Sequence, residues 1–238
     1  FGRDYDSRLS DIAERIPDVD ANNALKEGRV DLRHLPFVTI DPKTAKDFDD
    51  AVCLIEENGK PTLWVAIADV AHYIEPETLL DEEAQARATS VYLPHAVLPM
   101  LPSRLSDDLC SLRAKVPRLA MTVSMEIEDD WTIGKVSAFE SIIEVRENLS
   151  YDDALENPRF KHMMDLAEGL RQNEIRLNLN SAELRPRVDD DEISVNVKWP
   201  NKATKMIETF MVATNNSIGI MLGKEKAPLP WRCHAPPD

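Results

Sequence analysis

The stretch TIDPKTAKDFDDAV, residues 39–52, decides the fold because it joins two strand signals and carries four acidic side chains between them. Residues 37–40 (FVTI) and 51–55 (AVCLI) are short runs of β-branched and apolar residues, which favour buried strands. The acidic residues between them are Asp41, Asp47, Asp49 and Asp50. A cluster of negative charge therefore lies where one strand ends and the next begins.

Gathering these carboxylates in one place is costly unless a cation neutralises them. Two like charges about 4 Å apart repel by roughly 4 kcal/mol at an effective dielectric constant of about 20. Magnesium binds carboxylate oxygens and commonly bridges them to a substrate phosphate. Two such ions can hold the attacking and leaving oxygens of a displacement at phosphorus. The four aspartates are therefore candidate ligands of a divalent cation.

The four aspartates can meet at one point only if the backbone between them turns. In an extended chain, Asp47 and Asp49 project to one side and Asp50 to the other, unless the backbone turns there. Asp41 reaches the same point only if residues 42–46 loop back, which Pro42 favours. A solvated acidic turn is the alternative, but Phe48 and the apolar flanks draw the segment into the core. A calcium-binding EF-hand fits poorly, because the required glycine and closing glutamate are missing.

The rest of the sequence predicts a mixture of strands and helices. Asn58-Gly59 predicts a hairpin between strands at 51–55 and 62–70, and a second hairpin is expected to turn near Asp129-Asp130. Residues 76–93 have helical spacing with an N-cap at Thr78. The prolines of residues 93–112 predict an ordered loop with apolar anchors.

The last third alternates helix, strand and helix. Residues 151–177 are expected to be helical, and residues 188–200 to form a strand with Ile193, Val195 and Val197 on one face. The acidic run at 188–192 is expected to be merely exposed. Residues 206–222 follow the i, i+3, i+4 spacing of a helix. The order of elements predicts an α+β fold with a mixed, mostly antiparallel sheet packed with helices.

Composition limits the possible environments. The net charge of −15 gives no electrostatic attraction to nucleic acid or to an anionic membrane. Three cysteines without Cys-x-x-Cys spacing favour a reducing cytoplasm over a disulfide framework or a zinc site. No apolar run approaches the roughly 20 residues of a membrane span. We expect a soluble, cytoplasmic protein with no membrane partner.

Several motifs, taken in order, resemble the RNB catalytic domain of the ribonuclease II / ribonuclease R family. They are TIDPKTAKDFDDAV, LWVAIADVAHYI, VYLPHAVLPMLPSRLSDDLCSL, RLAMTVSMEI, MIETFMVATN and WRCHAPPD. The resemblance covers residues 31–238, which it identifies as the N-terminal portion of that domain. Residues 1–30 are then a polar lead-in segment.

The resemblance implies a processive, magnesium-dependent, hydrolytic 3′-to-5′ exoribonuclease that degrades or processes single-stranded RNA and releases nucleoside 5′-monophosphates. The four catalytic aspartates of the family fall on Asp41, Asp47, Asp49 and Asp50, which would hold one or two Mg²⁺ ions. Asp49 is the residue whose loss should most damage the chemistry. A catalytically dead RNA-binding or scaffolding member is the main competing hypothesis. A calcium-binding acidic loop in an unrelated protein would leave the other motifs unexplained.

Further residues match family positions. Tyr92 matches a tyrosine that packs against the 3′-terminal nucleotide, although a core tyrosine is the plainer alternative. Glu208 lies in a helix segment that contacts RNA, but it fits an exposed helical glutamate equally well. His72, Arg232 and His234 are expected to be structural.

The chain also departs from the family pattern. The catalytic domain of the family continues beyond the final PPD with an arginine-containing segment that assists at the scissile phosphate. Cold-shock and S1 modules of the OB type usually flank it and grip RNA. A second aromatic clamp has no clear counterpart here. We therefore expect a piece of a larger enzyme, whose basic flanking modules would offset the acidic balance of this part.

Overall fold

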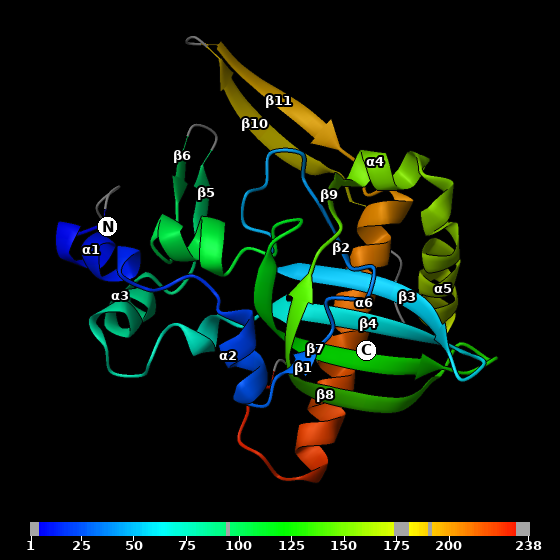
Figure 1. The fold of residues 1–238 in the computed structure, drawn as a ribbon. Coiled ribbons are helices and arrows are strands. Elements are labelled where there is room, and N and C mark those ends of the chain that lie inside the picture. The colour runs from blue at the N-terminus through cyan, green and yellow to red at the C-terminus, as the bar shows by residue number, and fades with distance from the viewer. Residues whose placement is uncertain (1–4, 94–95, 174–180, 190–191, 232–238) are drawn as a thin grey trace.

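A seven-stranded sheet forms the centre of the computed structural model, which describes residues 5–93, 96–173, 181–189 and 192–231 (Figure 1). The strand order is β1-β8-β7-β4-β3-β2-β9. The strands are β1 (Val30–Asp31), β2 (Val38–Asp41), β3 (Asp50–Glu57), β4 (Lys60–Ala68), β7 (Pro117–Ile127), β8 (Ile133–Glu144) and β9 (Glu147–Ser150). Among the described residues, the parallel pairs of this sheet are β1 with β8 and β2 with β9. The predicted α+β fold with a mixed, mostly antiparallel sheet is confirmed.

Both predicted hairpins are present, and local turn chemistry explains them. Asn58 and Gly59 have positive φ angles of 52° and 77°, as a tight turn between β3 and β4 requires. The turn between β7 and β8 contains Asp129 and Asp130, followed by Trp131 with φ 65°. These two hairpins supply the four central strands of the sheet.

Side-chain alternation along the central strands divides the core into two layers. In β4, Leu63 and Val65 face one cluster, while Trp64 and Ala66 face the other. The first cluster packs against α5 (Lys161–Gln172) and α6 (Lys202–Lys224), which cover one face of the sheet (Figure 1). The sheet is thus buried on both faces.

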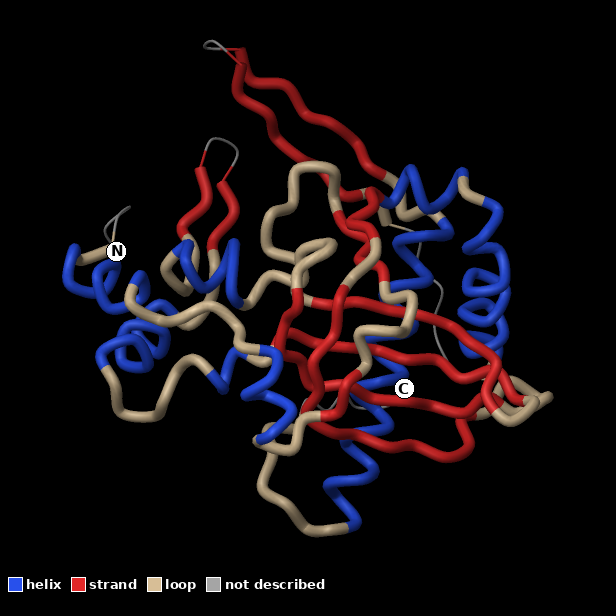
Figure 2. Tube along the Cα trace, viewed as in Figure 1, coloured by secondary structure: helices blue, strands red, loops and turns tan. Residues whose placement is uncertain are grey.

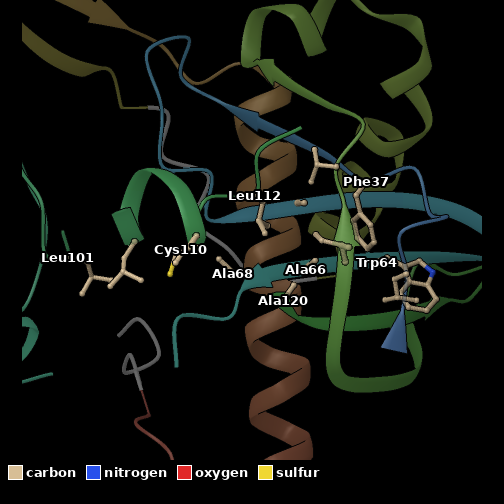
Figure 3. Close-up of a cluster of buried hydrophobic side chains, with 14 of the residues drawn as sticks. Phe37, Trp64, Ala66, Ala68, Leu101, Cys110, Leu112 and Ala120 are labelled. Carbon is tan, nitrogen blue, oxygen red and sulfur yellow. The ribbon is translucent and has the colours of Figure 1, made fainter. Parts of the chain in front are cut away.

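The opposite face is covered by an irregular segment rather than by long helices. Leu101, Leu105, Leu109 and Leu112 are buried and belong to the cluster that contains Phe37 and Trp64. Figure 3 shows Leu101, Cys110 and Leu112 in this cluster with alanines of the sheet. The expected apolar anchors of residues 93–112 are therefore confirmed. The same region also contains a small hairpin, β5 (Val91–Leu93) with β6 (Ala96–Leu98), and a π-helical turn at Leu105–Leu109, which the prediction of a plain loop missed.

Three predicted segments differ from the observed elements. The helix expected over 151–177 is divided into α4 (Tyr151–Glu156), a 3₁₀ turn (Pro158–Phe160) and α5, because Asn157 is extended and Pro158 lacks an N–H. Residues 174–177 lie outside the described residues. The helix capped by Thr78 is α3 (Leu79–Arg87), which ends where Ala88 adopts φ 62°.

The third difference concerns the strand expected over 188–200. It is instead the second half of a separate hairpin, β10 (Glu183–Asp189) with β11 (Glu192–Lys198). Val195 and Val197 alternate with polar residues as predicted, but their side chains are exposed. Residues 190–191 of the acidic run lie outside the described residues. The last predicted helix, 206–222, lies within α6 as expected.

Residues 5–29 of the predicted lead-in are ordered against the sheet domain. They form α1 (Ser7–Glu14) and α2 (Ala21–Lys26), and Leu9 and Ala24 are buried. Arg104 binds the Ile16 carbonyl and the Asp18 carboxylate at 2.9 and 2.8 Å. Across the described ranges, none of the helices has both the length and the apolar character needed to cross a bilayer.

Gly169 provides a test of how the turn after β7 packs on α5. A Cβ atom at Gly169 would lie 2.3 Å from Cδ2 of the Trp131 ring. We expect Gly169→Ala to lower the free energy of unfolding by about 1–3 kcal/mol, because the rigid ring and its turn must move. Urea denaturation measures this. At Gly134 the nearest atom is the flexible Glu128 carboxylate, 2.4 Å away, so Gly134→Ala is the control and should cost clearly less. Equal costs would contradict the packing argument.

Candidate active site

The four aspartates lie on one connection of the central sheet. Asp41 ends β2, Asp50 begins β3, and residues 42–49 form the loop between these neighbouring strands. Within the loop, the Ala45 N–H donates to the Pro42 carbonyl at 2.8 Å, as the predicted turn at Pro42 requires. The Asp49 carbonyl accepts from the Ala68 N–H at 2.9 Å. Antiparallel pairing therefore places Asp41 and Asp50 at the same end of two adjacent strands.

The carboxyl groups interact electrostatically with one another. Burial, followed by the Asp50 charge, raises the pKa of Asp41 to about 7. Burial, followed by the Asp49 charge, raises the pKa of Asp50 to about 6. Burial and then Asp47 also raise the pKa of Asp49, although Asp49 is the one member of the four whose residue surface is exposed. The four carboxyl groups are therefore near enough for their charges to influence one another.

The donor chemistry of the cluster suits a hard divalent cation. The buried Oδ2 atom of Asp41 has no hydrogen-bond partner among the described residues, although a polar atom in such a place normally has one. All candidate ligands are carboxylate oxygens, the type that magnesium prefers. Within the described part of the chain, however, no group of three or more His, Cys, Asp or Glu side chains is placed closely enough to hold a metal ion directly. The residues thus fit magnesium by chemistry, and their side chains have to draw closer to bind it.

Tyr92 lies beside the cluster. Its hydroxyl donates a hydrogen bond to Oδ2 of Asp47, and its ring comes from the small β5–β6 hairpin. This hydrogen bond, followed by partial burial, raises the pKa of Tyr92 to about 12. Tyr92 is 63% exposed, so it is not the core tyrosine of the plainer alternative. An exposed aromatic ring therefore stands at the edge of the acidic cluster.

A second set of residues adjoins Asp41. A cavity of about 220 Å³ is lined by Asp41, Pro42, Lys43, Thr44, Ser150, Tyr151, Asp152 and Lys198. The Lys198 ammonium lies 5.3 Å from the centroid of the Tyr151 ring. In Figure 2 the β5–β6 and β10–β11 hairpins project from the same end of the molecule. The two lysines, which sequence reasoning did not single out, bring positive charge to the side of the acidic cluster.

The other predicted residues have different surroundings. Glu208 lies on α6 with an exposed surface, and α6 follows the strand that carries Lys198. His72 is exposed, but its Nδ1 lies 3.3 Å from Nη2 of the buried Arg29, and its backbone N–H donates to the buried Asp69 carboxylate. Arg232 and His234 lie outside the described residues.

The raised pKa values predict an unusual pH dependence. The ordinary value is 3.8, so between about pH 4 and pH 7 the folded state binds more protons at Asp41 and Asp50 than the unfolded state. Their contribution to stability is present at low pH and is lost as the pH rises through that range. In EDTA, we expect the Tm of Asp41→Asn to match the wild type near pH 4 and to exceed it increasingly up to pH 8.

A contrasting carboxyl group provides the control. Arg33 lowers the pKa of Asp31 to about 2, so Asp31→Asn should lose stability relative to the wild type as the pH rises above that value. Magnesium at pH 8 should raise the Tm of the wild type and leave that of Asp41→Asn unchanged. A pH-independent difference between Asp41→Asn and the wild type would contradict the raised pKa of Asp41.

Comparisons with known proteins agree with this geometry. A model of the RNB domain matches residues 29–238. The chain is 33% identical to ribonuclease R of Vibrio cholerae over 256 residues, covering 98% of this chain and 30% of that protein. A structure of Mycoplasma genitalium RNase R in complex with ribose-methylated single-stranded RNA superposes with a TM-score of 0.90 at 31% identity, covering 98% of this chain and 39% of that chain. The chain thus spans well under half the length of these relatives.

The fold also occurs in a protein described as a pseudonuclease. Yeast Ssd1, a pseudonuclease, superposes with a TM-score of 0.68 at 16% identity, covering 88% of this chain and 28% of that chain. At this identity, the likeness shows the fold alone. The family match, by contrast, spans the acidic loop, Tyr92 and both faces of the sheet. The match to the RNB model covers residues 29–238, which is most of the chain and includes the whole candidate site. The chain therefore belongs to the RNB domain family.

Proposed function

We propose that this chain carries the metal site of a processive, magnesium-dependent 3′-to-5′ exoribonuclease that hydrolyses single-stranded RNA to nucleoside 5′-monophosphates. The single observation that carries the proposal is the cluster of interacting carboxyl groups, in which a buried oxygen of Asp41 has no partner among the described residues. Membership of the RNB family supports the choice of RNA as substrate. Residues 31–238 would form the N-terminal portion of the catalytic domain, and residues 1–30 would lead into it.

The position of each aspartate suggests its role in binding the metal or in cleaving the RNA. Asp41, Asp47 and Asp50 would hold one or two magnesium ions together with the terminal phosphate. Asp49, at the exposed rim, would act closest to the scissile bond. Magnesium, when bound, would neutralise the carboxylates, polarise the phosphate and activate a water molecule. The carboxylates would hold the ions and, through them, set the position of the phosphate.

Tyr92 and the neighbouring lysines would hold the RNA. An exposed aromatic ring gives a sequence-tolerant stacking surface for the 3′-terminal base. Lys43 and Lys198, which line the cavity beside Asp41, would contact backbone phosphates. Glu208 is a further candidate for a contact to the RNA. Cold-shock and S1 modules would supply the remaining grip, and the free, buried Cys53 and Cys110 support a reducing cytoplasmic location.

Two substitutions separate the ring of Tyr92 from its hydroxyl. We expect Tyr92→Ala to weaken binding of a single-stranded RNA about 10-fold, in line with roughly 1–3 kcal/mol per stacked base. Tyr92→Phe keeps the ring and loses the hydrogen bond to Asp47, so its affinity should stay near that of the wild type. Fluorescence anisotropy with a labelled RNA measures both. Equal losses in the two variants would exclude stacking as the role of the ring.

A catalytically dead RNA-binding protein is the second candidate. One observation favours this candidate: among the described residues, no three acidic side chains are close enough together to hold a metal ion directly. The deciding experiment incubates the full-length protein with a 5′-labelled single-stranded RNA, with magnesium or with EDTA. Stepwise shortening from the 3′ end that EDTA stops supports the exoribonuclease. Salt-dependent RNA binding without shortening at any magnesium concentration supports the dead binder.

A further inference from the structure

The backbone on both sides of Asp47 is held by one buried hydroxyl group. The Ser111 Oγ atom donates to the Lys46 carbonyl at 2.7 Å and accepts from the Phe48 N–H at 3.1 Å. These two backbone groups flank Asp47, and Ser111 has no exposed surface. The Leu112 N–H adds a third bond, to the Phe48 carbonyl at 2.8 Å. Segment 111–112 thus fixes the loop at Asp47.

Asn148 connects this segment to the strand that carries Asp41. Its Nδ2 atom donates to the Leu112 carbonyl at 3.0 Å and to Oγ1 of Thr39 at 2.9 Å, and its Oδ1 accepts from the Ala114 N–H at 2.8 Å. Thr39 lies in β2, two residues before Asp41. One chain of hydrogen bonds therefore runs from the Asp47 loop to the strand that ends at Asp41.

Side-chain packing alone does not hold the loop at this point. A hollow of about 340 Å³, open to solvent, lies against it and is lined by Ala45, Lys46, Phe48, Asp107, Arg113, Ala114 and Asn148. On this side the loop therefore lacks the close-packed contacts that restrain a segment in a protein interior. The hydrogen bonds of Ser111 and Asn148 restrain the loop instead. Without them, the loop has room to shift toward the hollow.

We propose that Ser111 and Asn148 are positioning residues that set the distance between the Asp47 and Asp41 carboxylates for magnesium binding. This inference rests on the proposed function. Magnesium demands near-ideal octahedral geometry at about 2.0–2.1 Å, so it tolerates little displacement of a ligand. Groups that orient metal ligands typically change metal affinity by about 10- to 100-fold when removed.

The test compares two buried serines in the full-length protein. Ser141 in β8 also has no exposed surface, and its Oγ contacts Oγ1 of Thr122 at 2.7 Å and the Ala120 carbonyl at 3.1 Å. Ser141→Ala therefore removes a similar pair of hydrogen bonds from the same sheet without touching the loop. In EDTA we expect Ser111→Ala and Ser141→Ala to lower the Tm to a similar extent.

Magnesium separates the two variants. For Ser111→Ala, we expect the magnesium concentration at half-maximal thermal stabilisation, and at half-maximal RNA hydrolysis, to rise about 10- to 100-fold while KM for RNA stays within about twofold. For Ser141→Ala both should match the wild type. If Ser111→Ala does not fold, Ser111→Cys replaces the hydroxyl by a slightly larger thiol with weaker hydrogen bonds and should show a smaller rise in the same direction. In an Asp47→Asn background, Ser111→Ala should add nothing.

Each failure has its own signature. Equal magnesium dependence of Ser111→Ala, Ser141→Ala and the wild type overturns the positioning role while leaving the exoribonuclease in place. An additive effect in the Asp47→Asn background also overturns it, because the hydroxyl would then act through another group. A wild-type protein that neither hydrolyses RNA nor gains stability from magnesium refutes the proposed function itself.

Discussion

Asp49→Asn abolishes release of nucleoside monophosphates and leaves RNA binding intact, if the site works as proposed. The substitution keeps the size of the side chain and removes its charge. Asp49 lies at the open edge of the cluster, where part of the residue is exposed to solvent. Partial burial of its carboxyl group, followed by the Asp47 charge, raises its pKa. A group in this position acts on the scissile phosphate and contributes little to holding the RNA chain. We expect the rate of release to fall at least ~10³-fold, which corresponds to about 4 kcal/mol of transition-state stabilisation.

The experiment uses a single-stranded RNA labelled at its 5′ end, with single-turnover rates for release and anisotropy for affinity. Asp165→Asn is the control, since Asp165 is an exposed aspartate on α5, and it should release mononucleotides at the wild-type rate. A loss of one unit of negative charge should leave RNA affinity unchanged or slightly higher, because the phosphate backbone is repelled less. Release by Asp49→Asn at more than a tenth of the wild-type rate would exclude Asp49 from the central role.

Sequence predicts those parts of this molecule that local chemistry specifies. The β3–β4 hairpin follows from Asn58-Gly59, because few other residues accept two successive positive φ angles. The acidic loop follows from four charges that require neutralisation, flanked by apolar runs. The burial of Leu105 and Leu109 follows from their being apolar residues in a proline-rich segment, although the π-helical turn that contains them does not. In each case the signal and the structure it specifies lie within a few residues of each other.

Other features depend on partners far away in the chain. Ser111 contacts backbone groups 63 and 65 residues away, and Asn148 reaches Thr39 across 109 residues. No local pattern marks either residue as part of a site. The β10 strand was missed because Pro186 and several charged residues argue against a strand, yet a two-stranded hairpin leaves one side of each strand without a partner strand. The fold class was therefore predictable, and the restraint of the loop was not.

Arg29→Met should strongly destabilise the fold although it lies outside the site. The Arg29 guanidinium binds the Asp69 carboxylate at 2.6 Å, with 4% and 7% of the two side chains exposed. Removing the guanidinium leaves a buried carboxylate without its counter-charge, and breaking a buried pair in this way costs about 3–5 kcal/mol. Urea denaturation gives the free energy of unfolding, and a constant m-value confirms that the same surface is exposed.

Two controls identify burial and charge as the cause. Arg8→Met removes an ion pair of similar length, 2.7 Å to Asp6, whose side chains are 80% and 43% exposed, and we expect no measurable change. Arg29→Met combined with Asp69→Asn removes both charges and should recover most of the loss, since the amide oxygen can still accept the His72 N–H. A cost for Arg29→Met no larger than that for Arg8→Met would contradict the argument. A cost of this size would show that the end of the lead-in, at Arg29, unfolds together with β4, the strand that precedes Asp69.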